Sequence, residues 1–186
     1  MLDEYHQKYA NRSDEEMNDR IAEKEKELIL IRDAVSPKLS SDILNIAVMG
    51  CGEKRFVAGH REIFTKVFDK PVKITTFDVT IDHLAGEENI IQHDCTQPLP
   101  GGPYDITFAH VLLRFIPKDK QWGLVKNSFN ALKDGGIAIH ILDPEDYETT
   151  ELVDLPSIEE NLKKEGISSE KVKLSIGQAL VLIKYH

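Results

Sequence analysis

Cysteine is scarce in this sequence of 186 residues, with only Cys51 and Cys95 present. The two show no Cys-x-x-Cys spacing, so neither a disulfide framework nor a zinc ribbon is indicated. A metal site built from His93, Cys95 and His110 is conceivable, but no pair of histidines at i, i+4 spacing supports one. We therefore expect no bound metal.

Long hydrophobic runs are also missing. No stretch approaches the roughly 20 apolar residues that a membrane-spanning helix needs. The first residues, Met1 to His6, are acidic and lack the apolar core of a secretory signal. We therefore expect no contact with a membrane, and the cytoplasm is the default location.

Positive charge is outweighed by negative charge. The chain has 23 lysines and arginines against 32 aspartates and glutamates, a formal net charge of -9. An acidic protein gains no affinity from neutralising phosphates unless it has a local basic patch. The lysines within residues 163–173 are interleaved with glutamates. Direct nucleic-acid binding is therefore disfavoured, although a partner subunit could supply it.

The remaining composition is that of a globular protein. Hydrophobic residues make up 41% of the chain and charged residues 30%, enough for a core and a well-solvated surface. At this length we expect a single domain over residues 1–186. Residues 43–184 are predicted to form its core, and residues 1–37 an N-terminal lid and helix.

Apolar and β-branched runs alternate with helical patterns along the chain. This order predicts an α/β fold, a mostly parallel sheet with helices on both faces. We expect strands at residues 43–49, 72–77, 89–92, 106–109 and 137–142, and a closing hairpin of residues 172–176 and 179–183. We expect helices at residues 14–35, 61–68, 118–133 and 156–165.

Local signals set several of these boundaries. Ser13 and Glu16 form a capping-box pattern at the start of the first long helix. Residues 53–60 are predicted to be a polar loop. The glycine pair at 135–136 is expected to stop the helix before the fifth strand. Residues 143–154, rich in Asp, Glu and Thr, are expected to be a linker.

The end of the first strand predicts a ligand site. The apolar run of residues 43–49 stops at Gly50-Cys51-Gly52, and two glycines one residue apart let the backbone approach a ligand closely. The second strand ends in Asp78. A glycine turn after one strand and a carboxylate at the tip of the next are typical of a nucleoside site, where the carboxylate accepts the ribose hydroxyls.

In order and spacing, several stretches together resemble the class I S-adenosylmethionine-dependent methyltransferases. They are Val48-Met49-Gly50-Cys51-Gly52, Phe77-Asp78, His93-Asp94-Cys95 with Pro98-Leu99-Pro100, Tyr104-Asp105 through residues 110–117, and Ala131 to Gly136. The resemblance extends over about residues 45–184. It implies a Rossmann-like, doubly wound sheet of seven strands in the order 3-2-1-4-5-7-6, with the last strand antiparallel.

The resemblance also implies a cofactor, S-adenosylmethionine. The residues that it assigns to cofactor binding are Gly50, Cys51, Gly52, Asp78, Asp94, Cys95 and His110. The glycine turn would pass under the methionine part of the cofactor. Asp78 would hold the ribose hydroxyls, and Asp94 would accept from the adenine amino group, with the Cys95 N–H at the ring.

The implied reaction is direct displacement of the sulfonium methyl by an acceptor that the sequence does not identify, a small molecule or a macromolecule presented by a partner. The protein then mainly aligns the reactants and excludes water. His110 is the candidate catalytic residue, as a general base if the acceptor must lose a proton early. Arg114 could anchor an anionic substrate, and Tyr5 with Tyr9 could form part of the lid.

Two departures from the family pattern leave alternatives open. The family usually has an acid at the position of Val48 and often a third glycine at the position of Lys54. A binding or scaffold subunit that has lost turnover is therefore an alternative. An NAD-dependent oxidoreductase is disfavoured, because Arg55 replaces the last glycine of Gly-x-Gly-x-x-Gly.

Each candidate residue also has a purely structural interpretation. The glycines could serve a plain strand-to-helix turn. Asp78 and Asp94 could cap turns, and His110 could be a structural histidine bonded to the backbone. Cys51 is expected to be a small packing residue and not a nucleophile.

Overall fold

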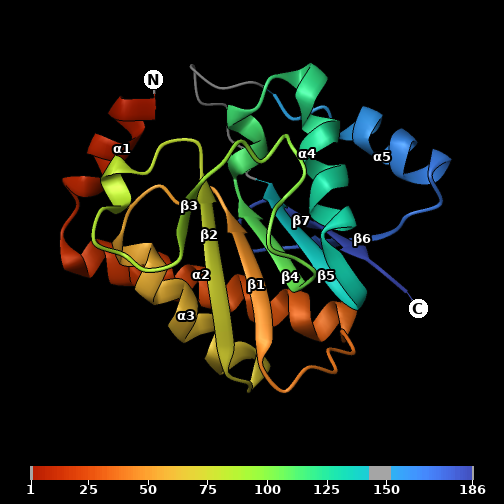
Figure 1. Cartoon of the computed structure of the whole chain (residues 1–186), viewed down its shortest axis with the longest axis horizontal. Helices are drawn as coiled ribbons and strands as arrows, with labels where there is room; N and C mark the ends of the chain where they lie inside the picture. Colours follow the sequence, from red (N-terminus) through yellow and green to blue (C-terminus); the bar gives the residue numbers. More distant parts are fainter. Residues whose placement is uncertain (1, 143–151, 186) are drawn as a thin grey trace.

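The apolar runs form the central sheet that their order predicts (Figure 1). The computed structural model describes residues 2–142 and 152–185. The sheet has seven strands in the order β3-β2-β1-β4-β5-β7-β6. The strands are β1 (Leu44–Met49), β2 (Val72–Asp78), β3 (Ile90–Gln92), β4 (Tyr104–His110), β5 (Leu132–Leu142), β6 (Ser168–Lys173) and β7 (Gln178–Ile183). Strand β7 pairs in antiparallel fashion with β5 and β6, and the other pairs of neighbouring strands are parallel. The predicted fold class is confirmed.

Helices cover both faces of the sheet. They are α1 (Leu2–Ala10), α2 (Asp14–Val35), α3 (Arg55–Phe68), α4 (Lys118–Asn130) and α5 (Leu155–Lys164), with the short 3-10 helices η1 (Asp82–Leu84) and η2 (Leu112–Phe115). One core lies between the sheet and the pair α2 and α3, and a second lies under α4 and α5. Figure 1 shows α1 apart from both layers, near the carboxyl ends of the parallel strands.

Strand β1 is buried on both faces, which explains its continuous apolar sequence. It pairs in parallel with β2 on one side and β4 on the other. Ile46 and Val48 pack into the core under α2 and α3, whereas Ala47 and Met49 pack into the core under α4. The loop after β1 therefore starts from the most constrained part of the sheet.

Helix α2 begins at the predicted cap. The Ser13 side chain accepts a hydrogen bond from the Glu16 N–H at 3.2 Å, and the Glu16 carboxylate accepts one from the Ser13 N–H at 2.8 Å. This confirms the capping box, a local device that fixes where a helix starts. The side chains that α2 buries are those of Met17, Lys24, Leu28 and Ile31, so one lysine lies in an otherwise apolar stripe.

The prediction of a polar loop over residues 53–60 is wrong, because α3 begins at Arg55. Charged residues made this segment look exposed, but it buries Phe56, Val57 and His60. Gly59 permits the close packing, since a Cβ there would lie 2.6 Å from Cδ1 of Ile21 on α2. Tertiary burial against α2 thus overrides the polar local composition.

The prediction that the glycine pair at 135–136 ends a helix is wrong. Helix α4 already ends at Asn130, and both glycines lie inside β5. A Cβ on Gly136 would lie 2.9 Å from the carbonyl oxygen of Asp105 on β4. The register of β4 against β5 shifts close to this point, so the glycines serve a close approach of two strands.

The remaining elements differ from expectation in smaller ways. Residues 2–10 form a helix that the sequence did not predict, and β6 begins at Ser168 instead of residue 172. Most of the expected linker lies at residues 143–151, outside the described residues. Among the helices of residues 2–142 and 152–185, none has the length and apolar character to cross a membrane.

Candidate functional site

The candidate site lies where β1, β2 and β4 end. The strand order reverses between β1 and β4, and ligands of open α/β sheets bind at such switch points. Gly50 follows β1 with φ +74°, a conformation that favours glycine. A Cβ at this position would lie 2.8 Å from Cδ1 of Leu112. The turn after β1 therefore requires glycine for both conformation and space.

Asp78, at the end of β2, is tied to this turn. Its carboxylate accepts hydrogen bonds from the Cys51 N–H at 2.8 Å and the Thr80 N–H at 3.2 Å. The side chain is 7% exposed and faces a cavity. Two carboxylate oxygens have about four acceptor sites, so Asp78 can cap the turn and still accept from a ligand.

All seven residues assigned to the cofactor from the sequence line one cavity of about 270 Å³. They are Gly50, Cys51, Gly52, Asp78, Asp94, Cys95 and His110. Apolar side chains complete its walls, among them Val79, Leu112 and Phe115. A concave, largely apolar space with a few convergent polar groups is the usual form of a small-molecule site.

Asp94 has a structural role at the edge of this cavity. One of its oxygens, Oδ1, accepts from the Thr96 N–H at 2.9 Å and the Thr96 hydroxyl at 2.8 Å. These two hydrogen bonds hold the pKa of Asp94 below its usual value. The predicted capping of the loop is thus observed, and it keeps a charged acceptor at the cavity.

Neither cysteine has the properties of a nucleophile. Burial raises the pKa of both the Cys51 and the Cys95 thiol to about 12. A neutral, buried thiol is a packing group, because the thiolate is the reactive form. This agrees with the expectation for Cys51.

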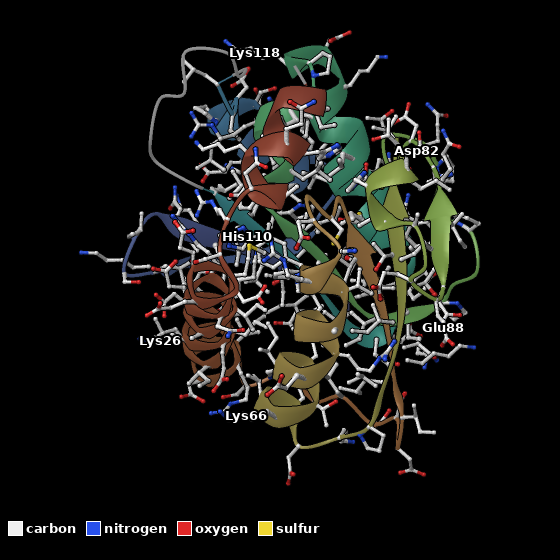
Figure 2. The ribbon with its side chains drawn as sticks, turned by 90° about the vertical axis from the view of Figure 1, so that its left-hand side faces the viewer. Lys26, Lys66, Asp82, Glu88, His110 and Lys118 are labelled. Atoms are coloured by element: carbon white, nitrogen blue, oxygen red, sulfur yellow. The ribbon has the colours of Figure 1, made fainter. Side chains whose placement is uncertain are left out.

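His110 ends β4 and reaches α2. Its Nε2 lies 3.0 Å from Oε2 of Glu27. A carboxylate accepts this bond, so Nε2 carries the proton, and in the neutral ring Nδ1 is the basic nitrogen. Figure 2 shows His110 near the middle of the molecule, whereas Lys26 and Lys66 lie at its margin. One partner of His110 is therefore a carboxylate.

A second cavity, also about 270 Å³, lies on the α2 and α3 side of the glycine turn. It shares Gly50, Cys51, Gly52 and His110 with the first cavity. Its other lining residues include charged groups of α2 and two side chains of α3: Arg20, Glu23, Lys24, Glu27, Phe56 and His60. The two cavities therefore meet at the glycine turn.

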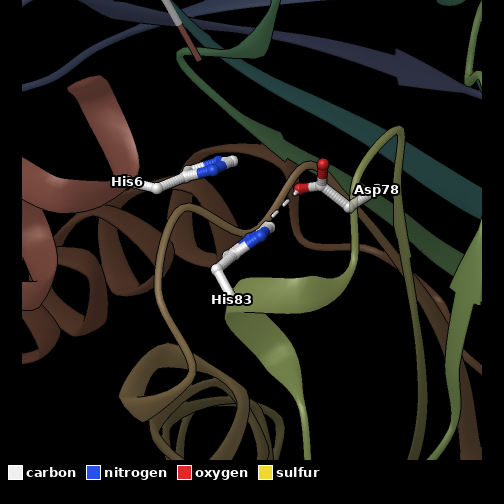
Figure 3. A group of neighbouring side chains, drawn as sticks. All are labelled: His6, Asp78 and His83. Atoms are coloured by element: carbon white, nitrogen blue, oxygen red, sulfur yellow. Dashed lines mark ion pairs between the residues drawn. The ribbon is translucent and has the colours of Figure 1, made fainter. Parts of the chain in front are cut away.

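His6, Asp78 and His83 form a group whose ligand atoms lie within 4.8 Å of one another (Figure 3). The geometry does not suit a metal ion. His83 Nε2 lies 2.6 Å from the Cys51 carbonyl oxygen, so it must donate a proton there. The rings of His6 and His83 stack at 3.7 Å and 19°, so their in-plane lone pairs do not converge. We assign a stack that seats α1 beside Asp78.

Arg55 holds the N-terminal segment against the site. Its guanidinium donates to the carbonyl oxygens of Tyr9 and Arg12 at 3.1 Å, and to the carboxylates of Asp14 and Glu53. The Tyr9 ring also packs edge-on against Phe56. The junction of α1 and α2 is thus fixed in the ligand-free state. The side chain of Tyr5 lies outside the described residues.

Two charged residues of the sequence prediction, Lys54 and Arg114, are absent from the described linings of both cavities. Lys54 is exposed, and Arg114 is buried at 3% exposure. Neither lines either cavity among the described residues. Contact of Arg114 with a substrate, and of Lys54 with the cofactor, therefore stays a prediction.

Sequence reasoning missed several residues of the site. Val79 carried one usable signal, its position directly after Asp78, which ends β2. Lys24 carried one as well, because it falls on the spacing of the buried stripe of α2. Glu27 and His83 gave no signal, since only the tertiary fold brings them to His110 and Asp78.

Comparison with known proteins identifies the fold. No family model and no curated sequence matches the chain, but solved structures do. An S-adenosylmethionine-dependent methyltransferase from Clostridium acetobutylicum has a TM-score of 0.63 and 13% identity, over 88% of this chain and 92% of that chain. DesVI from Streptomyces venezuelae has a TM-score of 0.63 and 11% identity, over 93% of this chain and 99% of that chain. Magnesium protoporphyrin IX methyltransferase from Synechocystis, with bound S-adenosylmethionine, has a TM-score of 0.53 and 15% identity, over 83% of this chain and 74% of that chain.

At sequence identities this low, the comparison shows the fold alone. The chain is similar to these proteins over most of its length, and it has the Rossmann-like fold of S-adenosylmethionine-dependent methyltransferases. The fold implied by the sequence motifs is therefore confirmed. Because one fold hosts many functions, function has to be argued from the site itself.

Proposed function

We propose that this chain is an S-adenosylmethionine-dependent methyltransferase. The observation that carries the proposal is the single cavity in which the glycine turn, Asp78, Asp94, Cys95 and His110 meet. These groups come from the ends of separate strands, yet they were assigned to one cofactor from sequence motifs alone. The fold of the neighbouring structures supports the same assignment.

The residues present fit this cofactor. Asp78 would accept from the ribose hydroxyls while it keeps its bond to the Cys51 N–H. Asp94, held ionised by Thr96, would accept from the adenine amino group, and Val79 and Leu112 would cover apolar surface. The turn at Gly50 provides room for close approach of the backbone. S-adenosylmethionine supplies an electrophilic methyl group on a sulfonium centre.

His110 and Glu27 are the residues that would manage a proton. Glu27 holds the His110 ring through Nε2, and His110 would take up the proton that an acceptor group loses. The carboxylate also stabilises the imidazolium that then forms. Residues of η2, with Phe115 among them, line the cavity and would help to exclude water.

The acceptor is proposed only as a class. It is a small molecule, or a macromolecule presented by a partner, because the described residues hold no large substrate-recognition element beyond α1 and α2. We further propose that residues 1–37 and 43–184 act as parts of one unit over residues 1–186, with α1 as a cover over the site through His6. The cytoplasmic location stays a prediction.

A binding subunit without turnover is the second candidate. It is favoured by Val48, which replaces the usual acid and is buried at 1% exposure in the core. An oxidoreductase is not favoured, because Arg55 occupies the last glycine position and its side chain is committed to four partners.

Calorimetry with three ligands tests the proposal. We expect S-adenosylmethionine and its demethylated product, S-adenosylhomocysteine, to bind at one molecule per chain, and NAD not to bind. Binding of NAD alone, or of none of the three, would overturn the assignment. Binding of both sulfur ligands, with no methyl transfer to any acceptor in the presence of cell extract, would favour the binding subunit.

A further inference from the structure

The second cavity contains a buried ammonium group with no hydrogen-bond or ion-pair partner among the described residues. Lys24 is 7% exposed, and its Nζ lies 4.8 Å from the centre of the Phe56 ring. Among the described residues, no hydrogen bond or ion pair reaches this Nζ. Burial lowers the pKa of Lys24 from 10.5 to about 8. A buried charge without a counter-ion is costly, so its presence points to a ligand.

His60 gives a second, independent indication. This side chain is 3% exposed and lines the same cavity. Neither ring nitrogen has a hydrogen-bond partner among the described residues. Aromatic rings surround it, including those of Phe56, Phe64 and Phe108. Burial, with Lys24 and His110 nearby, lowers the pKa of His60 well below its usual value, so the ring is neutral and has one N–H to donate.

The carboxylates around this cavity are already engaged. Glu27 accepts from His110 at 3.0 Å, and Glu23 pairs with Arg20 at 3.3 Å on the exposed side of α2. Among the described residues, the cavity therefore presents a cation that forms no direct ion pair, beside carboxylates that are paired with other groups. This pattern complements an α-amino acid, whose carboxylate and ammonium lie close together.

We propose that Lys24, with His60 beside it, binds the carboxylate of the amino-acid end of S-adenosylmethionine. The inference rests on the proposed function, which puts the nucleoside of this cofactor in the first cavity. The two cavities meet at the glycine turn and His110, so a ligand that starts at Asp78 reaches the second cavity across the turn. Its ammonium then faces Glu27.

This assignment accounts for both departures from the family sequence pattern. Val48 packs in the core, and Lys54 is exposed and lines neither cavity. The charged groups that would meet the amino-acid end come instead from α2, a helix before the first strand. In this chain the charged contacts to the amino-acid end would thus come from the N-terminal helix α2 instead of the glycine-rich segment.

Two ligands that differ only at the amino-acid end test the proposal. S-adenosylhomocysteine and 5′-methylthioadenosine share the nucleoside and the thioether, but 5′-methylthioadenosine lacks the amino-acid group. Each is titrated calorimetrically into the whole protein, into Lys24→Met and into Lys26→Met. Lys26 is a matched control, because it is an exposed lysine on the outer side of α2 (Figure 2).

We expect Lys24→Met to weaken binding of S-adenosylhomocysteine at least tenfold and to change binding of 5′-methylthioadenosine less than twofold. Lys26→Met should change neither. The melting temperature of free Lys24→Met should equal or exceed that of the parent, because a buried unpaired charge is removed. This readout separates loss of a ligand contact from loss of the fold.

The pH dependence provides a second readout. A carboxylate binds the protonated lysine, so affinity of the parent for S-adenosylhomocysteine should fall from pH 7 to pH 9, through the pKa of Lys24 at about 8. The titratable groups that line this cavity with Lys24 are Tyr9 of α1, Arg20, Glu23 and Glu27 of α2, Cys51 of the turn, His60 of α3 and His110 of β4. The affinity of the parent protein for 5′-methylthioadenosine should depend clearly less on pH. The same holds for the affinity of Lys24→Met for either ligand.

Other outcomes overturn the inference or its premise. If Lys24→Met weakens both ligands equally, or weakens neither, Lys24 does not bind the carboxylate of the amino-acid end, and the inference is wrong. If the parent protein binds neither ligand, the proposed function itself fails. These two failures are distinct, because only the second removes binding of S-adenosylhomocysteine to the unmodified protein.

Discussion

Asp78 combines two roles in one carboxylate. It accepts from the Cys51 N–H and so fixes the glycine turn, and it faces the cavity where a ribose would lie. The sequence predicted its position at the end of the second strand. The bond to Cys51 was not predictable, because it depends on how the turn after β1 folds back toward β2. The structural and functional interpretations of this residue are therefore compatible.

Substitution of Asp78 tests the ribose contact. We expect Asp78→Ala to weaken S-adenosylmethionine binding by about 2 to 3 kcal/mol, since charge-assisted hydrogen bonds to the hydroxyls are lost. Asp78→Asn keeps an acceptor for the Cys51 N–H, so it should weaken binding with a smaller loss of stability. Calorimetry and thermal melting measure the two effects. Asp82→Asn on the neighbouring η1 is the control. Equal affinity in Asp78→Ala and the parent would remove Asp78 from the site.

Lys54 gives a contrasting prediction. The family resemblance places a glycine at this position, but here the backbone has ordinary helical angles, φ -59° and ψ -36°, and the side chain is exposed. Lys54→Gly should leave S-adenosylmethionine affinity unchanged within about twofold, with a stability loss of up to about 1 kcal/mol from the added backbone freedom. A large loss of affinity would show that Lys54 does contact the cofactor.

At the scale of elements, α2 and α3 show what sequence patterns can and cannot predict. The bounds of α2 were predictable because its capping box is local. The start of α3 was not, because Arg55 and Lys54 look solvent-exposed, while burial of Phe56 depends on α2. The same limit applies to the site, where Glu27 meets His110 only after α2 has packed. Local sequence signals predict where a helix or strand begins and ends. Contacts between elements can be predicted only once the tertiary structure is known.

Arg55 connects three elements, and its removal should loosen one of them. Arg55→Met loses the bonds to the carbonyls of Tyr9 and Arg12 and to two carboxylates. We expect residues 6–12 to be protected from hydrogen exchange in the free parent protein and to lose protection in the variant, because α1 detaches. Overall stability should fall by about 1 to 3 kcal/mol.

Arg61→Met is the matched control, an exposed arginine on the same helix. It should change neither the protection nor the stability. Equal protection of residues 6–12 in Arg55→Met and the parent would show that other contacts hold α1. A lid that opens freely would instead show no protection in the parent and a gain when S-adenosylmethionine is added.

At the scale of the whole molecule, strand order was the most predictable property. Alternating strands and helices restrict the topology strongly, since crossovers are right-handed. The family motifs supplied the position of β7, whose antiparallel direction composition alone does not give. What local pattern could not predict was helix α1 and the second cavity. Both depend on contacts between residues far apart in the sequence.

Buried histidines predict how stability depends on pH. Burial lowers the pKa of His140 from 6.5 to about 4. Its Nε2 lies 2.8 Å from the Ser128 hydroxyl, and its Nδ1 has no partner among the described residues. The unfolded state binds more protons than the folded state between these pKa values. Stability should therefore fall as pH decreases from 6.5 to 4, by an amount on the order of 3 kcal/mol.

Urea denaturation at pH 7, 6, 5 and 4.5 measures this dependence. His140→Gln keeps a donor for Ser128 and removes the titrating ring, so its stability should fall less steeply over the same range. His60 contributes in the same direction, because its pKa is also lowered. The same slope in His140→Gln and the parent would show that His140 is not buried as the neutral form.

The most direct test of the account is a crystal structure of the protein with S-adenosylhomocysteine. We expect the ribose hydroxyls within hydrogen-bond distance of Asp78, the adenine beside Val79 and Asp94, and the amino-acid end across the glycine turn toward Lys24. Ligand bound at another surface, or no ligand at the ends of β1 and β2 at a saturating concentration, would contradict the claim that this edge of the sheet is a cofactor site.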